Sequence, residues 1–295
     1  MNLLRIQGII FSIIAAAVVL ASLFFAPFAA DHALLILAGL ILVLGVPHGA
    51  LDPLFADRLY RIRTTLDWLS FVCIYLLLAL LVVLLWRAAP LLFLSGFLLI
   101  SILHFSGDPR TGTPWPLRLL YGGAPIILPT LLHADETMRL FSFLIEASSA
   151  QQLVMVLTNL SLPWLIFLLC GAVYQLRIHG ITALEMAAVA ALAVVAAPLV
   201  SFTVFFCCMH SPRHLLRTWQ NTRLYSLKRL LVMALGPLLG VGVLLLGSSA
   251  LLAETAQDTK LMQIIFVGLA ALTVPHMVLV EQIRFYGWPK EKTHG

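Results

Sequence analysis

The chain has 295 residues, of which 61% are hydrophobic and only 11% are charged. Soluble domains carry about 25% charged residues, and a soluble chain of this length has no interior large enough to hide so much apolar surface. The composition therefore excludes a soluble globular protein and predicts that lipid surrounds most of the chain. The net charge of +5 comes from short basic clusters between apolar stretches, which is typical of membrane topology and argues against a nucleic-acid-binding protein.

Backbone groups in a lipid environment must be hydrogen-bonded within the protein, so the choice lies between helices and a closed barrel. The apolar runs are long, rich in Leu and Ala, and do not alternate, which favours helices. Windows of about 20 apolar residues predict spans at 8–29, 33–51, 67–86, 90–107, 117–132, 140–158, 161–176, 181–209, 230–252 and 262–283. We expect an all-α, polytopic membrane protein with about ten spans, a single transmembrane domain over residues 1–295 and no soluble domain.

Three of these predicted spans are unusual. The first resembles a signal peptide, but its apolar run is long enough to cross a membrane and further spans follow at once. The stretch 140–158 contains the charged residue Glu146. Its alternative interpretation is a re-entrant segment, which would reduce the number of spans to nine. The stretch 181–209 is too long for one span, and Pro198 predicts a kink within it.

Basic residues cluster between particular spans, and this clustering predicts the orientation of the chain. The clusters are Arg58, Arg61 and Arg63; Arg110 and Arg118; Arg213, Arg217, Arg223, Lys228 and Arg229; and Arg284, Lys290 and Lys292. Ten spans with a cytoplasmic N-terminus place every cluster inside, whereas nine spans place the largest cluster outside. We therefore predict ten spans in the cell (inner) membrane.

The nine histidines divide into two sets under this topology. Five lie at or near the cytoplasmic ends of predicted spans, namely His48, His104, His210, His214 and His276, and the other four lie in external connections or the terminal tail. A lone histidine in a membrane helix is more often a packing residue than a ligand. Five at a similar depth predict a metal site, because neutral imidazole is the commonest transition-metal ligand.

The local sequences around these histidines support this prediction. His48 and His104 each lie at a helix end rich in Gly and Pro, in GVPHGALD and LHFSGDP. His210 and His214 have the i, i+4 spacing that stacks two rings on one helix face. Pro212 lies between them and cannot donate a hydrogen bond to residue 208, so we expect a kink there. His276, in TVPHM, has no polar neighbour in the sequence, and it stays open whether it is a ligand, a partner of a ligand or a substrate contact.

Other residues near the histidines have two interpretations each. Asp52, Asp108 and Glu281 are either solvated helix ends or carboxylates that accept the far N–H of a metal-bound imidazole. Aromatic side chains flank the motifs and either line a substrate site or belong to the interfacial belt; they are Phe105, Phe202, Phe205, Phe206, Trp115, Tyr121 and Trp219. The four cysteines have no metal-binding spacing, and we interpret them as packing residues.

An all-imidazole ligand set restricts the metal. Iron(II) with four histidines keeps open positions for dioxygen, whereas structural zinc prefers thiolates, and nothing in the sequence selects copper. A di-iron membrane desaturase generally has about eight histidines in cytoplasmic boxes, which this chain lacks. A site at membrane depth admits a lipid-soluble substrate.

The motifs GVPHGALD (45–52), HFSGDP (104–109), HSPRH (210–214) and VPH (274–276) together resemble the Brp/Blh family of membrane β-carotene 15,15'-dioxygenases. The resemblance covers nearly the whole chain in span order and histidine spacing. It implies an iron(II) enzyme that splits the central double bond of β-carotene with O2 to give two retinals. It also implies His48, His104, His210 and His214 as the Fe(2+) ligands, a carotenoid substrate and a functional link to a microbial rhodopsin.

Two other functions remain as alternatives at this point. A transporter with a histidine proton relay would have ionisable residues spread through the membrane and repeated halves, and neither feature is visible in the sequence. A non-catalytic assembly factor for a retinal protein would need no metal.

Overall fold

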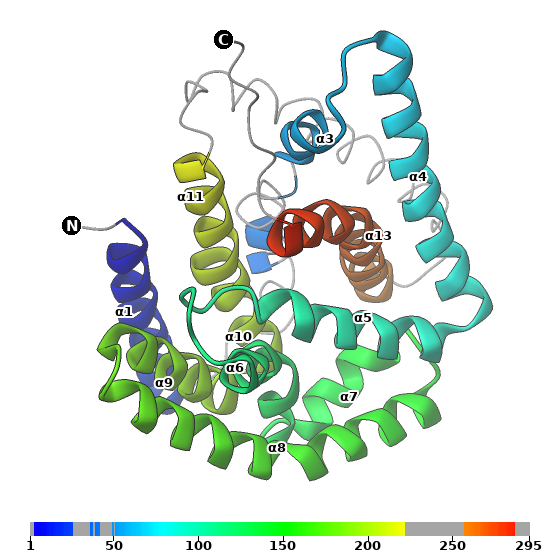
Figure 1. Ribbon diagram of the computed structural model, residues 1–295. Coiled ribbons are helices and arrows are strands. Elements are labelled where there is room, and N and C mark those ends of the chain that lie inside the picture. The colour runs from blue at the N-terminus through cyan, green and yellow to red at the C-terminus, as the bar shows by residue number, and fades with distance from the viewer. Residues whose placement is uncertain are drawn as a thin grey trace. The chain divides into compact units, whose positions relative to one another are not determined.

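The computed structural model describes residues 3–25, 36–37, 39–41, 49, 51–221 and 257–286, and its regular elements in these ranges are all helices (Figure 1). The all-α prediction is therefore confirmed for the described part of the chain. Two compact units are distinguished: Met1–Gly45 with Pro90–Arg223, and Val46–Ala89 with Leu224–Gly295. The single transmembrane domain over residues 1–295 stays a prediction.

The first unit contains most of the described helices. These are α1 (Leu3–Phe24), α5 (Pro90–Phe105), α6 (Trp115–Ile127), the 3-10 turn Leu128–Leu131, α7 (Ala134–Ser142), α8 (Ala147–Leu176), α9 (Gly180–Val195), α10 (Pro198–Val204), the π-helical segment Phe205–His210 and α11 (Ser211–Asn221). Helix α9 packs against both α1 and α8, and α6 packs against α5 and α8. This arrangement brings the ends of α5 and α10 to the same part of the unit.

The second unit contains α3 (Asp52–Tyr60), α4 (Thr65–Ala88) and α13 (Gln257–Tyr286). Helix α4 begins at a capping box, in which the Asp67 amide donates to the Thr64 hydroxyl at 3.2 Å and the Thr64 amide donates to the Asp67 carboxylate at 2.9 Å. Helix α13 packs against α3 and α4. The three helices bring Asp52, Tyr75 and His276 into contact.

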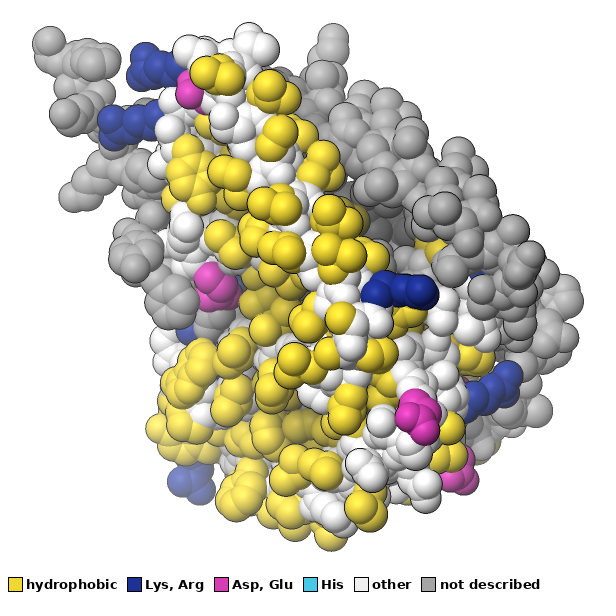
Figure 2. Space-filling model, turned by 90° about the vertical axis from the view of Figure 1, so that its right-hand side faces the viewer, with side chains coloured by type: hydrophobic (Ala, Val, Ile, Leu, Met, Phe, Trp, Pro, Cys, Tyr) yellow, Lys and Arg dark blue, Asp and Glu magenta, His cyan; other side chains and the backbone are white. Residues whose placement is uncertain are grey.

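Four helices in the described ranges are long and apolar enough to cross a membrane: Leu3–Phe24, Thr65–Ala88, Ala147–Leu176 and Thr259–Ile283. A fifth span results if Trp115–Leu131 and Ala134–Ser142, which are bent by 105°, count as one. None of the side chains of α4 is buried, and apolar side chains cover nearly its whole length (Figure 2). A helix with this surface is compatible with membrane insertion.

Two predicted span boundaries can be compared with the helices. The predicted spans 140–158 and 161–176 were wrong as separate helices, since Ala147–Leu176 is one continuous helix that Pro163 does not interrupt. The kink predicted at Pro198 is confirmed, because α9 ends at Val195 and Pro198 begins α10. The predicted span 230–252 lies outside the described residues, and the count of ten spans stays a prediction.

Candidate functional site

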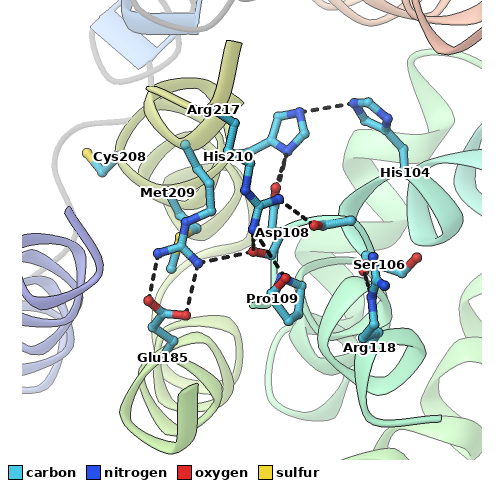
Figure 3. Close-up of polar contacts among 12 residues, drawn as sticks. His104, Ser106, Asp108, Pro109, Arg118, Glu185, Cys208, Met209, His210 and Arg217 are labelled. Atoms are coloured by element: carbon cyan, nitrogen blue, oxygen red, sulfur yellow. Dashed lines mark hydrogen bonds and ion pairs between the residues drawn. The ribbon is translucent and has the colours of Figure 1, made fainter. Parts of the chain in front are cut away.

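Two of the predicted metal ligands lie together in the first unit. His104 is in the last turn of α5, and His210 ends the π-helical segment that follows α10. Both side chains are buried, and their Nε2 atoms are 3.1 Å apart (Figure 3). The fold thus brings two imidazoles from motifs about a hundred residues apart to a single point.

Asp108 fixes the orientation of the His210 ring. Its carboxylate oxygens lie 3.0 and 3.1 Å from Nδ1 of His210 (Figure 3). Since an ionised carboxylate only accepts hydrogen bonds, Nδ1 carries the proton, and the lone pair of the neutral ring is on Nε2. This is the contact described by the second interpretation of Asp108, in which the carboxylate holds the far side of a metal-binding imidazole.

The backbone around His210 departs from a regular α-helix for a physical reason. Residues Phe205–His210 form a π-helix, a rare geometry that is frequent at functional sites. Pro212 has no N–H to donate to the Cys208 carbonyl, and the Gln7 amide of α1 donates to that carbonyl instead, at 2.9 Å. The Gln7 amide also lies 3.2 Å from the Met209 carbonyl. A side chain from another helix thus satisfies carbonyl groups next to His210.

A buried ion pair lies next to this turn. The Arg213 guanidinium donates to both carboxylate oxygens of Glu185 at 2.6 and 2.9 Å, and its Nε donates to Gln7 at 2.9 Å. Burial alone would lower the pKa of Arg213, but the bonds and charge of Glu185 raise it, so the guanidinium stays charged. The glycine at position 8 leaves room for this pair, because a Cβ there would displace the Glu185 carboxylate.

Arginine side chains also hold the loop that follows α5. Arg217 donates to the carbonyls of Gly107 and Asp108 at 2.6 and 2.7 Å, and Arg213 donates to the Asp108 carbonyl at 3.1 Å (Figure 3). The Arg118 Nε donates to the Ser106 carbonyl at 2.8 Å. These bonds satisfy carbonyls of the loop that follows α5, which lie outside the helix. The HFSGDP and HSPRH motifs are therefore bound directly to each other.

Aromatic rings surround His210. Phe105 lies edge-on to the His210 ring at 4.8 Å between centroids, and Phe206 stacks on it at 5.6 Å. Phe205 contacts both Phe105 and Tyr121, and Phe202 stacks on Phe206. By contrast, Trp115 and Trp219 are 51% and 43% exposed. The predicted substrate-lining set therefore separates into rings near His210 and exposed rings that resemble an interfacial belt.

Of the other two predicted ligands, the structure describes only one. His214 lies on α11, one turn after His210, and its side chain is half-buried. His48 lies outside the described residues. Where the chain is described, no three His, Cys, Asp or Glu side chains are grouped so that they could hold a metal ion. The first unit therefore supplies a pair of imidazoles, and the further ligands stay predictions.

The second unit contains a separate histidine–carboxylate pair. His276 Nδ1 lies 2.6 Å from Asp52, and the Tyr75 hydroxyl donates to the other oxygen of Asp52 at 2.8 Å. Asp52 and His276 are both 2% exposed. Glu281 lies farther along α13 and is half-buried.

The sequence reasoning missed Gln7, Tyr75 and Glu185. A signal existed for Glu185, because it is the only charged residue in the predicted span 181–209. Gln7 and Tyr75 lie at the edge of one apolar run and inside another, and nothing in their own sequence context distinguishes them from packing residues.

Comparison with known proteins gives two matches. The sequence profile of the family described as Beta-carotene 15,15'-dioxygenase matches residues 39–284. A protein of that same name from Uncultured marine bacterium 66A03 is 33% identical over 268 residues, which is 83% of this chain and 91% of the relative. No solved structure matches the chain.

Proposed function

Because this chain belongs to the β-carotene 15,15'-dioxygenase family, we propose that it cleaves the central 15,15' double bond of β-carotene with O2 and releases two molecules of all-trans-retinal. The observation that supports this most directly is the buried pair of His104 and His210, with Asp108 behind one ring. The relative's name describes the same activity for a protein that aligns over most of the chain.

The donor set is suited to iron(II). The Nε2 atoms of His104 and His210 are 3.1 Å apart, so both imidazoles could donate to one divalent cation, and imidazole is a ligand that suits iron. We propose that His104, His210 and His214 hold Fe(2+), with His48 as the fourth ligand by sequence. When bound, the metal would mediate electron transfer between the polyene and O2, so that the double bond breaks, each oxygen atom ends in one aldehyde and no external reductant is consumed.

The residues of this chain have separate tasks in the proposed reaction. Asp108 holds the proton on Nδ1 of His210, which leaves Nε2 as the donor atom. Phe105 and Phe206 cover the ring with apolar surface, which favours a hydrocarbon chain and excludes water. Arg213 and Arg217 hold the loop of Asp108 through its carbonyl and so keep the carboxylate behind the ring.

We also propose that the chain is integral to the cell membrane, with the N-terminus and the histidine-bearing helix ends on the cytoplasmic side. Four predicted spans precede the HFSGDP loop, so the side of His104 does not depend on how many spans follow it. His210 contacts His104 and shares its side. A reporter that is active only in the cytoplasm, fused after Gly112, should be active, and activity of a periplasmic reporter at this position would refute the orientation.

The function is tested by expression in bacterial cells that accumulate β-carotene. The wild-type chain should bleach the cells and produce retinal, whereas His210→Ala should lower retinal formation at least 100-fold at equal protein level. The matched control is His179→Ala, which removes a half-buried histidine that bonds to Thr182 in another part of the unit. Unchanged turnover in His210→Ala would refute the ligand assignment, and an apocarotenoid other than retinal would refute the cleavage position. A link to a microbial rhodopsin predicts that the retinal formed reconstitutes a co-expressed opsin.

A further inference from the structure

The second unit contains a buried histidine that the proposed function does not use. His276 lies within α13, directly after Pro275, and its Nδ1 is 2.6 Å from Oδ1 of Asp52. Asp52 is the first residue of α3, and the Tyr75 hydroxyl of α4 donates to its Oδ2 at 2.8 Å. Three helices thus each contribute one residue to a chain of two hydrogen bonds that ends on an imidazole.

The hydrogen-bond chain determines which nitrogen of His276 is a donor atom. The ionised Asp52 accepts from Nδ1 of His276, so the lone pair of the neutral ring is on Nε2. Among the described residues, the partners of the Asp52 carboxylate are this imidazole and the Tyr75 phenol. A buried carboxylate is costly without a positive charge nearby. The N-terminus of α3 favours the charge of Asp52. A cation on the imidazole would compensate it further, either as a second proton or as a metal ion bound through Nε2.

The first unit provides a comparison for this choice. His210 makes the same Nδ1 contact to Asp108 and is equally buried. The two aspartates also have the same sequence context, because each follows a histidine by four residues, His48 before Asp52 and His104 before Asp108. His48 lies outside the described residues. An arrangement that suits His210 for metal binding is therefore repeated at His276.

We propose that His276 binds divalent iron through Nε2, and that Asp52 and Tyr75 are positioning residues that hold its ring. The proposal rests on the proposed function in one respect, namely that the enzyme uses iron. It assigns His276 the role of ligand and gives Tyr75 a function that its position in an apolar helix does not suggest.

Iron binding by the purified, full-length chain in detergent tests this directly. Metal-free protein is titrated anaerobically with Fe(2+) against a competing chelator, and Co(2+) is used in parallel for its visible absorption. Replacing a carboxylate that supports a metal-bound histidine typically lowers metal affinity about 10–100-fold, which we expect for Asp52→Asn. We expect a loss of at least 100-fold for His276→Ala and of a few-fold for Tyr75→Phe, and the Co(2+) spectrum should change in all three variants.

The competing explanation is a structural imidazolium–aspartate pair. In that case His276→Ala and Asp52→Asn would lower the unfolding midpoint of the metal-free protein and leave the iron affinity and Co(2+) spectrum as in the wild type, which overturns the proposal. Added imidazole should restore iron binding to His276→Gly if His276 is a ligand. If the alanine and glycine variants fail to fold, Asp52→Asn, which preserves the shape of the side chain, gives the deciding affinity.

The matched control and the wild type distinguish the two proposals. His179→Ala, a histidine hydrogen-bonded to Thr182, should bind iron as the wild type does. A wild-type chain that binds no iron overturns both the proposed metal and the inference. A wild-type chain that binds iron, with unchanged affinity in Asp52→Asn and His276→Ala, overturns the inference alone.

Discussion

The two histidine–carboxylate pairs of this protein share the same type of contact and have different surroundings. In both, an aspartate accepts from Nδ1 of a buried histidine, at 3.0 Å for Asp108 and His210 and at 2.6 Å for Asp52 and His276. The first pair lies beside the guanidinium groups of Arg213 and Arg217, which bond to the Asp108 carbonyl. The second pair lies beside the neutral phenol of Tyr75.

This difference concerns how each aspartate is held. Asp108 lies in the loop that follows α5, and the carbonyls of this loop need donors because they lie outside the helix. The arginines supply them and in turn require Glu185 and Gln7 to compensate and orient Arg213. Asp52 begins a helix, where a carboxylate is favoured by the helix dipole, so its main chain needs no such clamp. The first pair should therefore be sensitive to distant charged residues, and the second should not.

Removing one member of the Arg213–Glu185 pair should have the largest effect on this comparison. Breaking a buried ion pair costs about 3–5 kcal/mol because the remaining charge is uncompensated. We expect Glu185→Ala to lower stability by this amount, measured as the SDS concentration that unfolds the protein in mixed micelles. The acidic residue Glu136 is exposed, and Glu136→Ala should change stability by less than about 0.5 kcal/mol.

The double variant Glu185→Leu, Arg213→Leu identifies the cause of that loss. Replacing both charges by apolar residues is often close to neutral, so it should be more stable than either single variant. It should nevertheless lose iron affinity, since the Asp108 carbonyl loses a donor. If the double variant binds iron as the wild type does, the arginine clamp does not position the first pair.

A glycine in each unit allows a second comparison of stability and iron affinity between the two units, and the first of them lies where α6 contacts α5. A Cβ on Gly122 would clash with the Ile102 carbonyl and the Ser106 amide, both of which belong to the backbone next to His104. Gly122→Ala should cost about 1–3 kcal/mol of stability and lower iron affinity. In the second unit, an added Cβ on Gly268 of α13 has no atom of the described residues within 4 Å. Gly268→Ala should therefore stabilise the protein by about 0.5–1 kcal/mol, and equal losses in both variants would contradict this reasoning.

Much of this arrangement could be predicted from the sequence. The helical class follows from apolar runs that do not alternate, and the kink at Pro198 follows from the missing N–H of proline. The pairing of His104 with His210 and the contact of Asp108 both join residues that already stood out as polar groups at the ends of apolar runs. Such residues are few in a chain with 11% charge, so each is informative.

The parts that could not be predicted have physical reasons of their own. The stretch 140–158 was predicted as a separate span, with a re-entrant segment as the alternative because of its polar residues, but Ser148 and Gln151 lie at the exposed start of one helix, Ala147–Leu176. Arg213 and Arg217 were used only as members of a basic cluster that predicts orientation, whereas both bond to other groups of the site. The partner of His276 was missed because Asp52 is more than two hundred residues away in the chain.

The aspartate of the first pair should affect iron more than stability. Asp108→Asn keeps the shape of the side chain but weakens the acceptor for His210 Nδ1, and we expect iron affinity to fall about 10–100-fold. Asp108→Glu keeps the charge and should recover part of that loss. Comparison with Asp52→Asn, measured by the same chelator titration, shows whether both pairs contribute to metal binding. Wild-type affinity in Asp108→Asn would mean that this hydrogen bond has no influence on the ligand.

The smallest effects, and the clearest contrast, should come from one tyrosine in each unit. The Tyr75 hydroxyl donates to Asp52 and lies 3.3 Å from the Leu272 carbonyl, whereas the Tyr121 hydroxyl is buried and has no hydrogen-bond partner among the described residues. Losing a hydrogen bond costs about 1 kcal/mol, and removing a buried hydroxyl without a partner is neutral or stabilising. Tyr75→Phe should therefore lower the unfolding midpoint in SDS titration, and Tyr121→Phe should leave it unchanged or raise it. Because Tyr121 packs against Phe205, whose ring contacts Phe105 beside His210, a change in retinal formation by Tyr121→Phe without a loss of stability would assign its hydroxyl to the reaction and not to the fold.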